Sequence, residues 1–200
     1  MSETDTGVTG RGRRPARERL LEAAARRFYA DGVAATGIDT ITAEAGVAKM
    51  SLYNNFSSKA DLVRAYLDAR HEEWLGLYRA RLEHADGPNE GVLAVFDAYC
   101  DHAGFAYEHG FRGCGLLNAA AELPAGDEGR AVVRAHKEQV ERLIADHLEQ
   151  LLPGRPDEAR ATAEHLSFLL EGAMARAGLE GDGERVQHAR SMAAALLDRL

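Results

Sequence analysis

Apolar residues recur at helical spacing along most of the chain, and short clusters of Gly and Pro separate the periodic segments. Leu20, Ala24 and Phe28 recur at every fourth position, which places them on one face of a helix that ends before Gly32. Similar patterns predict further helices over residues 38–45, 49–56, 58–83, 90–109, 116–123, 127–152, 157–177 and 183–200. The pattern therefore predicts an all-α protein.

The chain divides into three parts by the character of its segments. Residues 1–15 are polar and then basic, ending in Arg11-Gly12-Arg13-Arg14-Pro15, and are interpreted as a disordered basic arm. Residues 16–62 form a compact group of three short helices, and residues 63–200 form a larger helical part.

Two helix starts match capping boxes, in which Ser or Thr at the cap is followed three residues later by an acid. They are Thr36 with Asp39, and Ser58 with Asp61. Between them, the helices predicted at 38–45 and 49–56 are joined by a tight turn at Gly46, the form of a helix-turn-helix.

The outer face of the second of these helices carries hydroxyl, amide, thioether and ammonium groups and no acid. Such groups can contact phosphates, base edges or a thymine methyl in the major groove. The residues concerned are Lys49, Met50, Ser51, Tyr53, Asn54 and Asn55. Thr36 and Lys59, at helix starts, are candidate phosphate contacts. The alternative from spacing alone is the ordinary polar face of a three-helix bundle.

Charge is distributed unevenly along the chain. The formal net charge is −8, but residues 1–66 hold ten Lys or Arg against eight Asp or Glu, whereas residues 67–200 hold 14 against 24. Seven of the N-terminal cations fall between Arg11 and Arg27. A basic start on an acidic body suits a protein that presents one end to phosphates.

The segment from Thr36 to Leu62 resembles the signature of TetR-family transcriptional regulators. It joins a threonine-opened helix, Ala-Gly-Val, a small or basic pair, Leu-Tyr, a polar pair, Phe, and Ser-Lys before an acid and Leu. The resemblance covers about residues 16–66. It implies that Lys49, Met50, Ser51, Tyr53 and Asn54 lie in or beside the major groove of double-stranded DNA, and that Thr36, Tyr53 and Lys59 hold its backbone. Met50 departs from the Gly that members often have there, and Asn55 from a frequent His.

The resemblance also implies a function for residues 63–200, which would bind a small-molecule effector and form a homodimer through the last two helices. Two apolar stripes are compatible with this: Ala163, Leu166, Leu170, Ala173 and Ala177, and Val186, Ala189, Ala193, Leu196 and Leu200. Together with the same helices of a second chain they would make a four-helix bundle. The alternative is that both stripes pack within one chain.

The effector site is expected among the middle helices. The Gly113-Cys114-Gly115 segment, with Asn118 and Glu122 one helical turn apart, resembles a segment found in one branch of the family. These two polar side chains either bind ligand or cap a neighbouring helix. Trp74, Tyr99, Phe111 and Phe168 are further candidate lining residues, although aromatic residues at this spacing also fill ordinary cores. Cys114 is interpreted as a small buried residue, with a redox role as the alternative.

The sequence offers no usable nucleophile–base pair, phosphate loop or metal cluster, so we expect no catalytic site, metal or cofactor. The two Cys and the absence of an apolar run long enough to span a bilayer favour a cytoplasmic location without membrane association. The hypothesis is a repressor that ligand releases from an inverted-repeat operator. The rival hypotheses are a helical ligand-binding or adaptor protein without DNA binding, and an enzyme.

Overall fold

The computed structural model describes residues 15–105 and 107–200, and all regular secondary structure within them is helical. Apart from Pro15, the predicted basic arm lies outside the described residues. The helices are α1 (Ala16–Asp31), α2 (Ile38–Ala45), α3 (Lys49–Asn55), α4 (Lys59–Leu82), α5 (Pro88–Ala103), α6 (Gly115–Glu122), α7 (Glu128–Leu151), α8 (Pro156–Glu180) and α9 (Glu184–Leu197). The predicted all-α fold with three N-terminal helices is confirmed.

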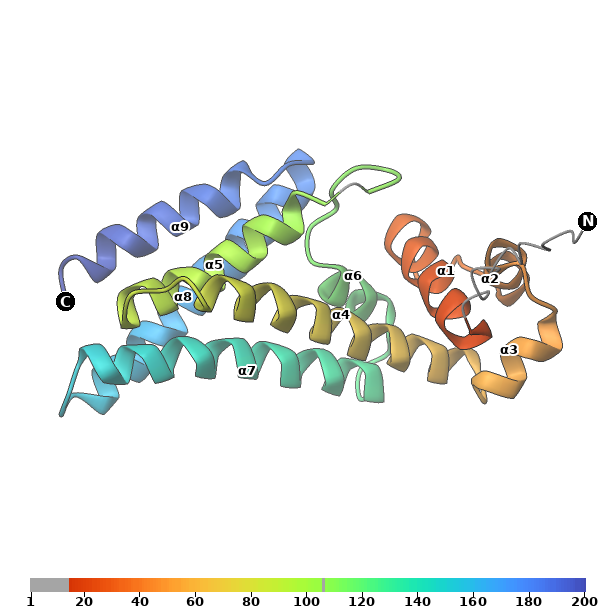
Figure 1. Cartoon of the computed structure of the whole chain (residues 1–200), viewed down its shortest axis with the longest axis horizontal. Coiled ribbons are helices and arrows are strands. Elements are labelled where there is room, and N and C mark those ends of the chain that lie inside the picture. Colours follow the sequence, from red (N-terminus) through yellow and green to blue (C-terminus); the bar gives the residue numbers. More distant parts are fainter. Residues whose placement is uncertain (1–14, 106) are drawn as a thin grey trace, which may run out of the picture.

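Helices α1, α2 and α3 form a small head at one end of an elongated molecule, and the C-terminus lies at the other end (Figure 1). The apolar stripe of α1 is buried, with Leu20 and Ala24 fully inaccessible and Phe28 nearly so. Ile41 of α2 and Leu52 of α3 pack into the same core. The head is therefore held by the residues that the periodicity selected, because helices this short need tertiary packing to persist.

Helix α4 connects the head to the body without interruption (Figure 1). It carries Leu62 in the core of the head and Trp74 in the core of the body. The predicted division between residues 62 and 63 therefore falls inside one continuous helix, and the division remains a prediction. A rigid helix shared by both parts fixes the orientation of the head on the body.

The body is a bundle in which α7 packs against α4, α5 and α8, and α9 packs against α5 and α8. Its core combines aliphatic and aromatic side chains, among them Leu166, Trp74 and Phe96. Helix α6 lies between α1 and the bundle (Figure 1). Within residues 15–105 and 107–200, no helix combines the length and apolarity needed to cross a membrane.

Two predicted helix ends are wrong. Helix α5 stops at Ala103, because the amide of Gly104 closes it by donating to the carbonyls of Cys100 and Asp101, so residues 104–105 and 107–109, which were predicted to be helical, form a loop. Helix α8 continues through Gly178 to Glu180 instead of ending at 177. A Cβ at Gly178 would lie 2.7 Å from the backbone nitrogen of Gly113, so glycine here permits contact between helix and loop.

Candidate functional site

The turn between α2 and α3 sets the angle of the two helices. Gly46 adopts a left-handed conformation with φ of 61°, which favours glycine. Its amide donates to the Ala43 carbonyl at 3.1 Å, and the Val47 amide donates to the Thr42 carbonyl at 3.0 Å. These bonds satisfy the last carbonyls of α2 and direct the chain into α3.

Helix α3 has one buried and one open face. Leu52 is fully buried in the head, whereas 69% of Met50 and 48% of Tyr53 are exposed, and Lys49 and Asn54 are exposed beside them. Ser51 is half-buried. The structure therefore brings five of the predicted DNA-contacting side chains onto one helix, without a carboxylate on α3 itself.

A carboxylate from the neighbouring helix does reach this face, which the sequence reasoning missed. Asp39 of α2 accepts from the Lys49 ammonium at 2.9 Å, and this hydrogen bond raises the pKa of Lys49. More than half of each side chain is exposed, so the pair contributes little to stability and can open. The Asp39 carboxylate therefore competes with a phosphate for the Lys49 ammonium.

The two other predicted phosphate contacts differ in accessibility. Thr36 is 3% exposed and its hydroxyl donates to the Gly32 carbonyl at 2.6 Å. The capping box predicted for Thr36 is wrong, because Gly37 occupies the N-cap of α2 and no side chain caps that helix. Lys59 is the first residue of α4 and is half-buried.

The second predicted capping box, at the start of α4, is half right. The Ser58 hydroxyl accepts from the Asp61 amide at 3.1 Å, as expected. The Asp61 carboxylate, however, accepts from the Ser57 amide at 2.9 Å instead of that of Ser58. The start of α4 beside α3 is nonetheless firmly held.

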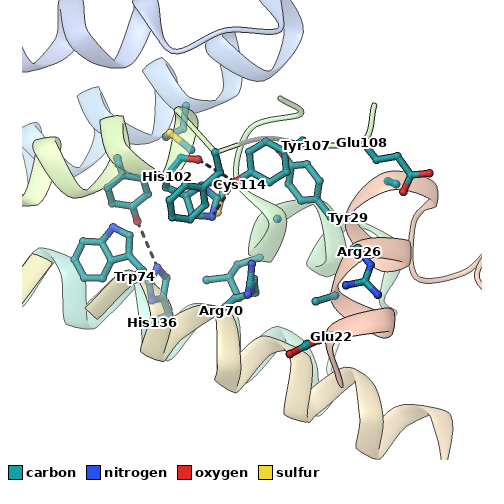
Figure 2. A pocket seen from close by; sticks show the side chains of 17 residues that line it. Glu22, Arg26, Tyr29, Arg70, Trp74, His102, Tyr107, Glu108, Cys114 and His136 are labelled. Carbon is teal, nitrogen blue, oxygen red and sulfur yellow. Dashed lines mark hydrogen bonds between the residues drawn. The ribbon is translucent and has the colours of Figure 1, made fainter. Parts of the chain in front are cut away.

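A cavity of about 590 Å³ lies in the body next to the head. It is bounded by α1, α4, α5, the loop after α5 and the first turn of α6, with single side chains from α7 and α8. Figure 2 shows Trp74 at one end, Tyr29 and Tyr107 at the other, and Arg70 rising from α4 between them. Its volume is in the range of sites that bind small organic molecules.

Two of the six predicted ligand-binding residues, Trp74 and Tyr99, line this cavity. Phe111 is buried without lining it, and Phe168, 66% exposed, lies on the outer surface of the body. The prediction of a common pocket for these four aromatic residues is therefore wrong for Phe111 and Phe168. Aromatic identity alone does not specify which face of a helix its side chain occupies.

Asn118 and Glu122 also lie outside this cavity. The Asn118 amide donates to the Arg112 carbonyl at 2.8 Å. The Glu122 carboxylate accepts from the backbone amides of Val33 and Ala34 at 3.1 and 2.6 Å. These bonds link α6 to the loop before it and to the loop after α1, so neither side chain caps a helix, and ligand binding by Asn118 and Glu122 stays a prediction.

The cavity contains lining residues that the sequence reasoning missed. Tyr29 belongs to α1, which was assigned wholly to the DNA-binding part, and Arg70 is one of many charged residues of α4. His102 and His136 come from α5 and α7, and Cys114 from the loop. No local signal distinguishes these residues, because only the packing of five separate segments brings them together.

The ionisable groups around the cavity are arranged so that both histidines are neutral. Burial, and then the charges of Arg70 and Lys137, lower the pKa of His102 to about 4. Burial and the charge of Lys137 lower the pKa of His136 still further. Arg70 itself is paired with Glu73 at 2.7 Å.

Tyr29, in the last turns of α1, contacts the loop that follows α5. We call this group of contacts the α1 clamp; it is made by Tyr29, Tyr107, Arg112 and Gly113. The Tyr29 hydroxyl accepts from the Arg112 amide at 2.7 Å and donates to the Gly113 carbonyl at 3.2 Å. The Arg112 guanidinium donates to the Tyr29 carbonyl at 2.8 Å. The Tyr29 and Tyr107 rings stack with centroids 4.2 Å apart. The wall of the cavity therefore holds the last turn of α1 directly.

The outer face of α8 and α9 carries exposed apolar side chains. The predicted stripe residues Leu166, Leu170, Val186 and Ala193 are all fully buried inside this one chain, as the alternative interpretation held. Phe168 and Leu179 of α8 and Met192 of α9 are instead exposed by 66, 86 and 49%, and the predicted stripe residue Leu200, beyond the end of α9, is 40% exposed. If the last two helices form an interface, this outer face is the one available.

Comparisons with known proteins match both the head and the whole fold. Residues 20–66 match the family model of bacterial regulatory proteins of the tetR family. Over 64 residues, 32% of this chain and 30% of the relative, the chain is 45% identical to the HTH-type transcriptional regulator TtgR of Pseudomonas putida. It is 34% identical over 82 residues to the HTH-type transcriptional repressor KstR2 of Mycolicibacterium smegmatis, covering 41% of this chain and 40% of that protein. The matches thus span less than half the length of these curated relatives.

The likeness to solved structures extends over nearly the whole chain. SCO4454, a TetR-family transcriptional regulator from Streptomyces coelicolor, superimposes with a TM-score of 0.79 at 36% identity, covering 92% of this chain and 94% of that one. The match therefore includes the helical body as well as the helix-turn-helix. The chain belongs to the TetR family of transcriptional regulators.

Proposed function

We propose that this protein is a homodimeric repressor that binds an inverted-repeat operator and is released from it by a small molecule bound in the cavity. The observation that carries the proposal is that one cavity wall, Tyr29, belongs to a helix of the DNA-binding head. A ligand that displaces Tyr29 acts on the head directly. Release requires only that the ligand binds the displaced state more tightly than the DNA-bound state.

In the DNA complex, Met50, Ser51, Tyr53 and Asn54 would face the major groove, and the exposure of all of them except the half-buried Ser51 supports this. Lys49 would exchange Asp39 for a phosphate, and Lys59 would contact the backbone at the start of α4, where the helix dipole also favours an anion. The proposed part of Thr36 is indirect. Its buried hydroxyl holds the loop that positions the first backbone amides of α2 near a phosphate.

Dimerisation would use the outer face of α8 and α9, where Phe168 and Met192 flank a shallow apolar groove. Two-fold symmetry would then set the two α3 helices about one helical turn of DNA apart, or a multiple of it, which is why an inverted repeat is expected. The change Phe168→Glu should convert the dimer to a monomer in sedimentation velocity. Leu117→Glu, which also places an acid at an exposed apolar position but on α6, is the matched control.

Selection from a random duplex library at physiological salt tests sequence-specific binding. The expected result is an inverted repeat. With that duplex, Lys59→Ala should reduce the slope of log affinity against log salt by about one unit. Tyr53→Ala should weaken specific and non-specific binding together. Recovery of nothing better than random duplex contradicts the proposed operator binding.

A further inference from the structure

The cavity is built from aromatic faces, which limits the shape of what it holds. The Trp74 and Tyr99 rings lie with centroids 5.2 Å apart at one end. The stacked rings of Tyr29 and Tyr107 lie at the other end (Figure 2). Aromatic side chains bind flat rings by stacking and edge contacts as well as by burial. A planar aromatic molecule therefore fits these walls better than a flexible chain does.

The electrostatics of the cavity disfavour a cationic ligand, although aromatic walls alone would suit one. His102, inside the cavity, resists protonation and its pKa falls to about 4, because it is buried and faces the charges of Arg70 and Lys137. A ligand cation placed beside it would meet the same burial and the same two charges.

An anionic ligand is disfavoured for a different reason. Arg70 is paired with Glu73 at 2.7 Å and Lys137 with Glu171 at 2.7 Å. Arg26, a third cation of the wall, is paired with Glu44 at 2.6 Å. Within the described residues, a bound anion would therefore meet only cations that already have a carboxylate partner, and Glu108 adds a further carboxylate to the cavity wall. Burying an ion without a counter-charge is costly, so the charge balance favours a neutral molecule.

Two donors in the wall lack an acceptor. The Arg70 Nε and Trp74 Nε1 atoms are buried without a hydrogen-bond partner within the part of the chain that the structure describes. The Tyr29 and Tyr107 hydroxyls, by contrast, already donate to the carbonyls of Gly113 and His102. Buried donors are normally satisfied, so a ligand acceptor that reaches Arg70 or Trp74 would remove an existing cost.

We propose that the effector is a neutral, planar aromatic molecule carrying an oxygen acceptor of the ketone or ester type, whose oxygen accepts from Arg70 Nε or Trp74 Nε1. This inference rests on the proposed function in taking the cavity as the effector site. The rings lie between the aromatic ends of the cavity, and the oxygen faces α4.

A matched series of naphthalenes tests the inference by calorimetric titration of the full chain near pH 7.5. The series consists of 2-acetylnaphthalene (neutral with an acceptor), 2-ethylnaphthalene (neutral without one), 2-naphthoate and 2-naphthyltrimethylammonium. We expect 2-acetylnaphthalene to bind about tenfold more tightly than 2-ethylnaphthalene, as one satisfied donor implies, and both ions to bind more weakly than either. Tighter binding of either ion, equal binding of the two neutral compounds, or binding of none overturns the inference.

Two conservative variants test the donors. Arg70→Lys keeps a cation beside Glu73 but has no Nε, and Trp74→Phe keeps an aromatic ring without the indole donor. At least one of them should reduce the preference for 2-acetylnaphthalene over 2-ethylnaphthalene from about tenfold to less than about threefold. Arg160→Lys, an exposed pair partner near the start of α8, is the matched control and should leave the preference unchanged. An undiminished preference in both cavity variants refutes the assigned donors.

Release of the selected operator, followed by fluorescence anisotropy, separates this inference from the proposed function. Binding of 2-acetylnaphthalene without release supports the ligand class and contradicts ligand-induced release. Operator binding that is intact in a protein that binds none of the four compounds overturns the ligand class and leaves the regulator proposal in place.

Discussion

Removal of one hydroxyl from the α1 clamp, by Tyr29→Phe, tests whether the clamp joins the head to the body. The substitution keeps the ring, and with it the stack on Tyr107 and the cavity wall. It removes the acceptor of the Arg112 amide at 2.7 Å and the donor to the Gly113 carbonyl at 3.2 Å. The perturbation is therefore confined to two hydrogen bonds between α1 and the loop.

The magnitude follows from the burial of the two groups left behind. Tyr29 is 8% exposed, so the Gly113 carbonyl loses its partner in a protected place, which costs about 1–3 kcal/mol. The Arg112 amide is only partly buried and can regain water, so its loss adds about 1 kcal/mol or less. We expect the free energy of unfolding to fall by about 2–3 kcal/mol.

Urea unfolding measures this loss, and Tyr53→Phe is the matched control. Tyr53 is 48% exposed and its hydroxyl has no hydrogen-bond partner within the described residues, so its removal should change the free energy of unfolding by less than about 0.5 kcal/mol. In operator binding, Tyr53→Phe should weaken affinity directly. Tyr29→Phe should leave affinity in the absence of ligand nearly unchanged but reduce the weakening that ligand produces. Equal stability of the two variants, or undiminished ligand response in Tyr29→Phe, would refute the clamp.

Three further outcomes are expected. Because the pKa of His102 is lowered in the folded protein, this histidine binds a proton between pH 7.5 and 5.5 in the unfolded chain but not in the native one. The free energy of unfolding should therefore fall by about 1 kcal/mol over that range because of this group. Replacement of His102 by Gln should lessen the fall measured by urea unfolding. Gly178→Ala should lower the melting temperature because its Cβ would overlap the loop backbone, whereas Gly76→Ala, with open space around it, should raise the free energy of unfolding by about 0.5–1 kcal/mol; equal effects contradict the close approach. Glu122→Gln should lower the free energy of unfolding in urea by about 1 kcal/mol, because it removes one of the two oxygens that accept from backbone amides of the head. Glu149→Gln, at an exposed position, should leave the free energy of unfolding measurably unchanged.

The sequence predicted the head well because its information is local. The stripe of Leu20, Ala24 and Phe28, the turn at Gly46 and the polar face of α3 each follow from spacing within a few residues. The predictions for the head were wrong where one local pattern is compatible with two hydrogen-bonding arrangements. Thr36 has the form of a cap, but its hydroxyl bonds back to Gly32 because the loop brings that carbonyl nearer.

The cavity was beyond prediction from sequence for a physical reason. Trp74 and Tyr99 were identified as candidates from their residue type, but so were Phe111 and Phe168, which lie elsewhere. A helix surface shows its apolar positions without showing which partner covers each one: in α8 and α9, Leu166 and Val186 are buried within the chain, whereas Phe168 and Met192 are exposed.

The sequence by itself determined the helical class, the helix-turn-helix and the chemistry that α3 presents, because helix periodicity and turn glycines act over one or two turns. Only the tertiary structure decided that Tyr29 of the head lines the cavity of the body, that Glu122 binds the head instead of the cavity, and that Asp39 holds Lys49. These contacts depend on how separate helices pack, and packing is fixed by the fit of whole surfaces that no short stretch of sequence contains.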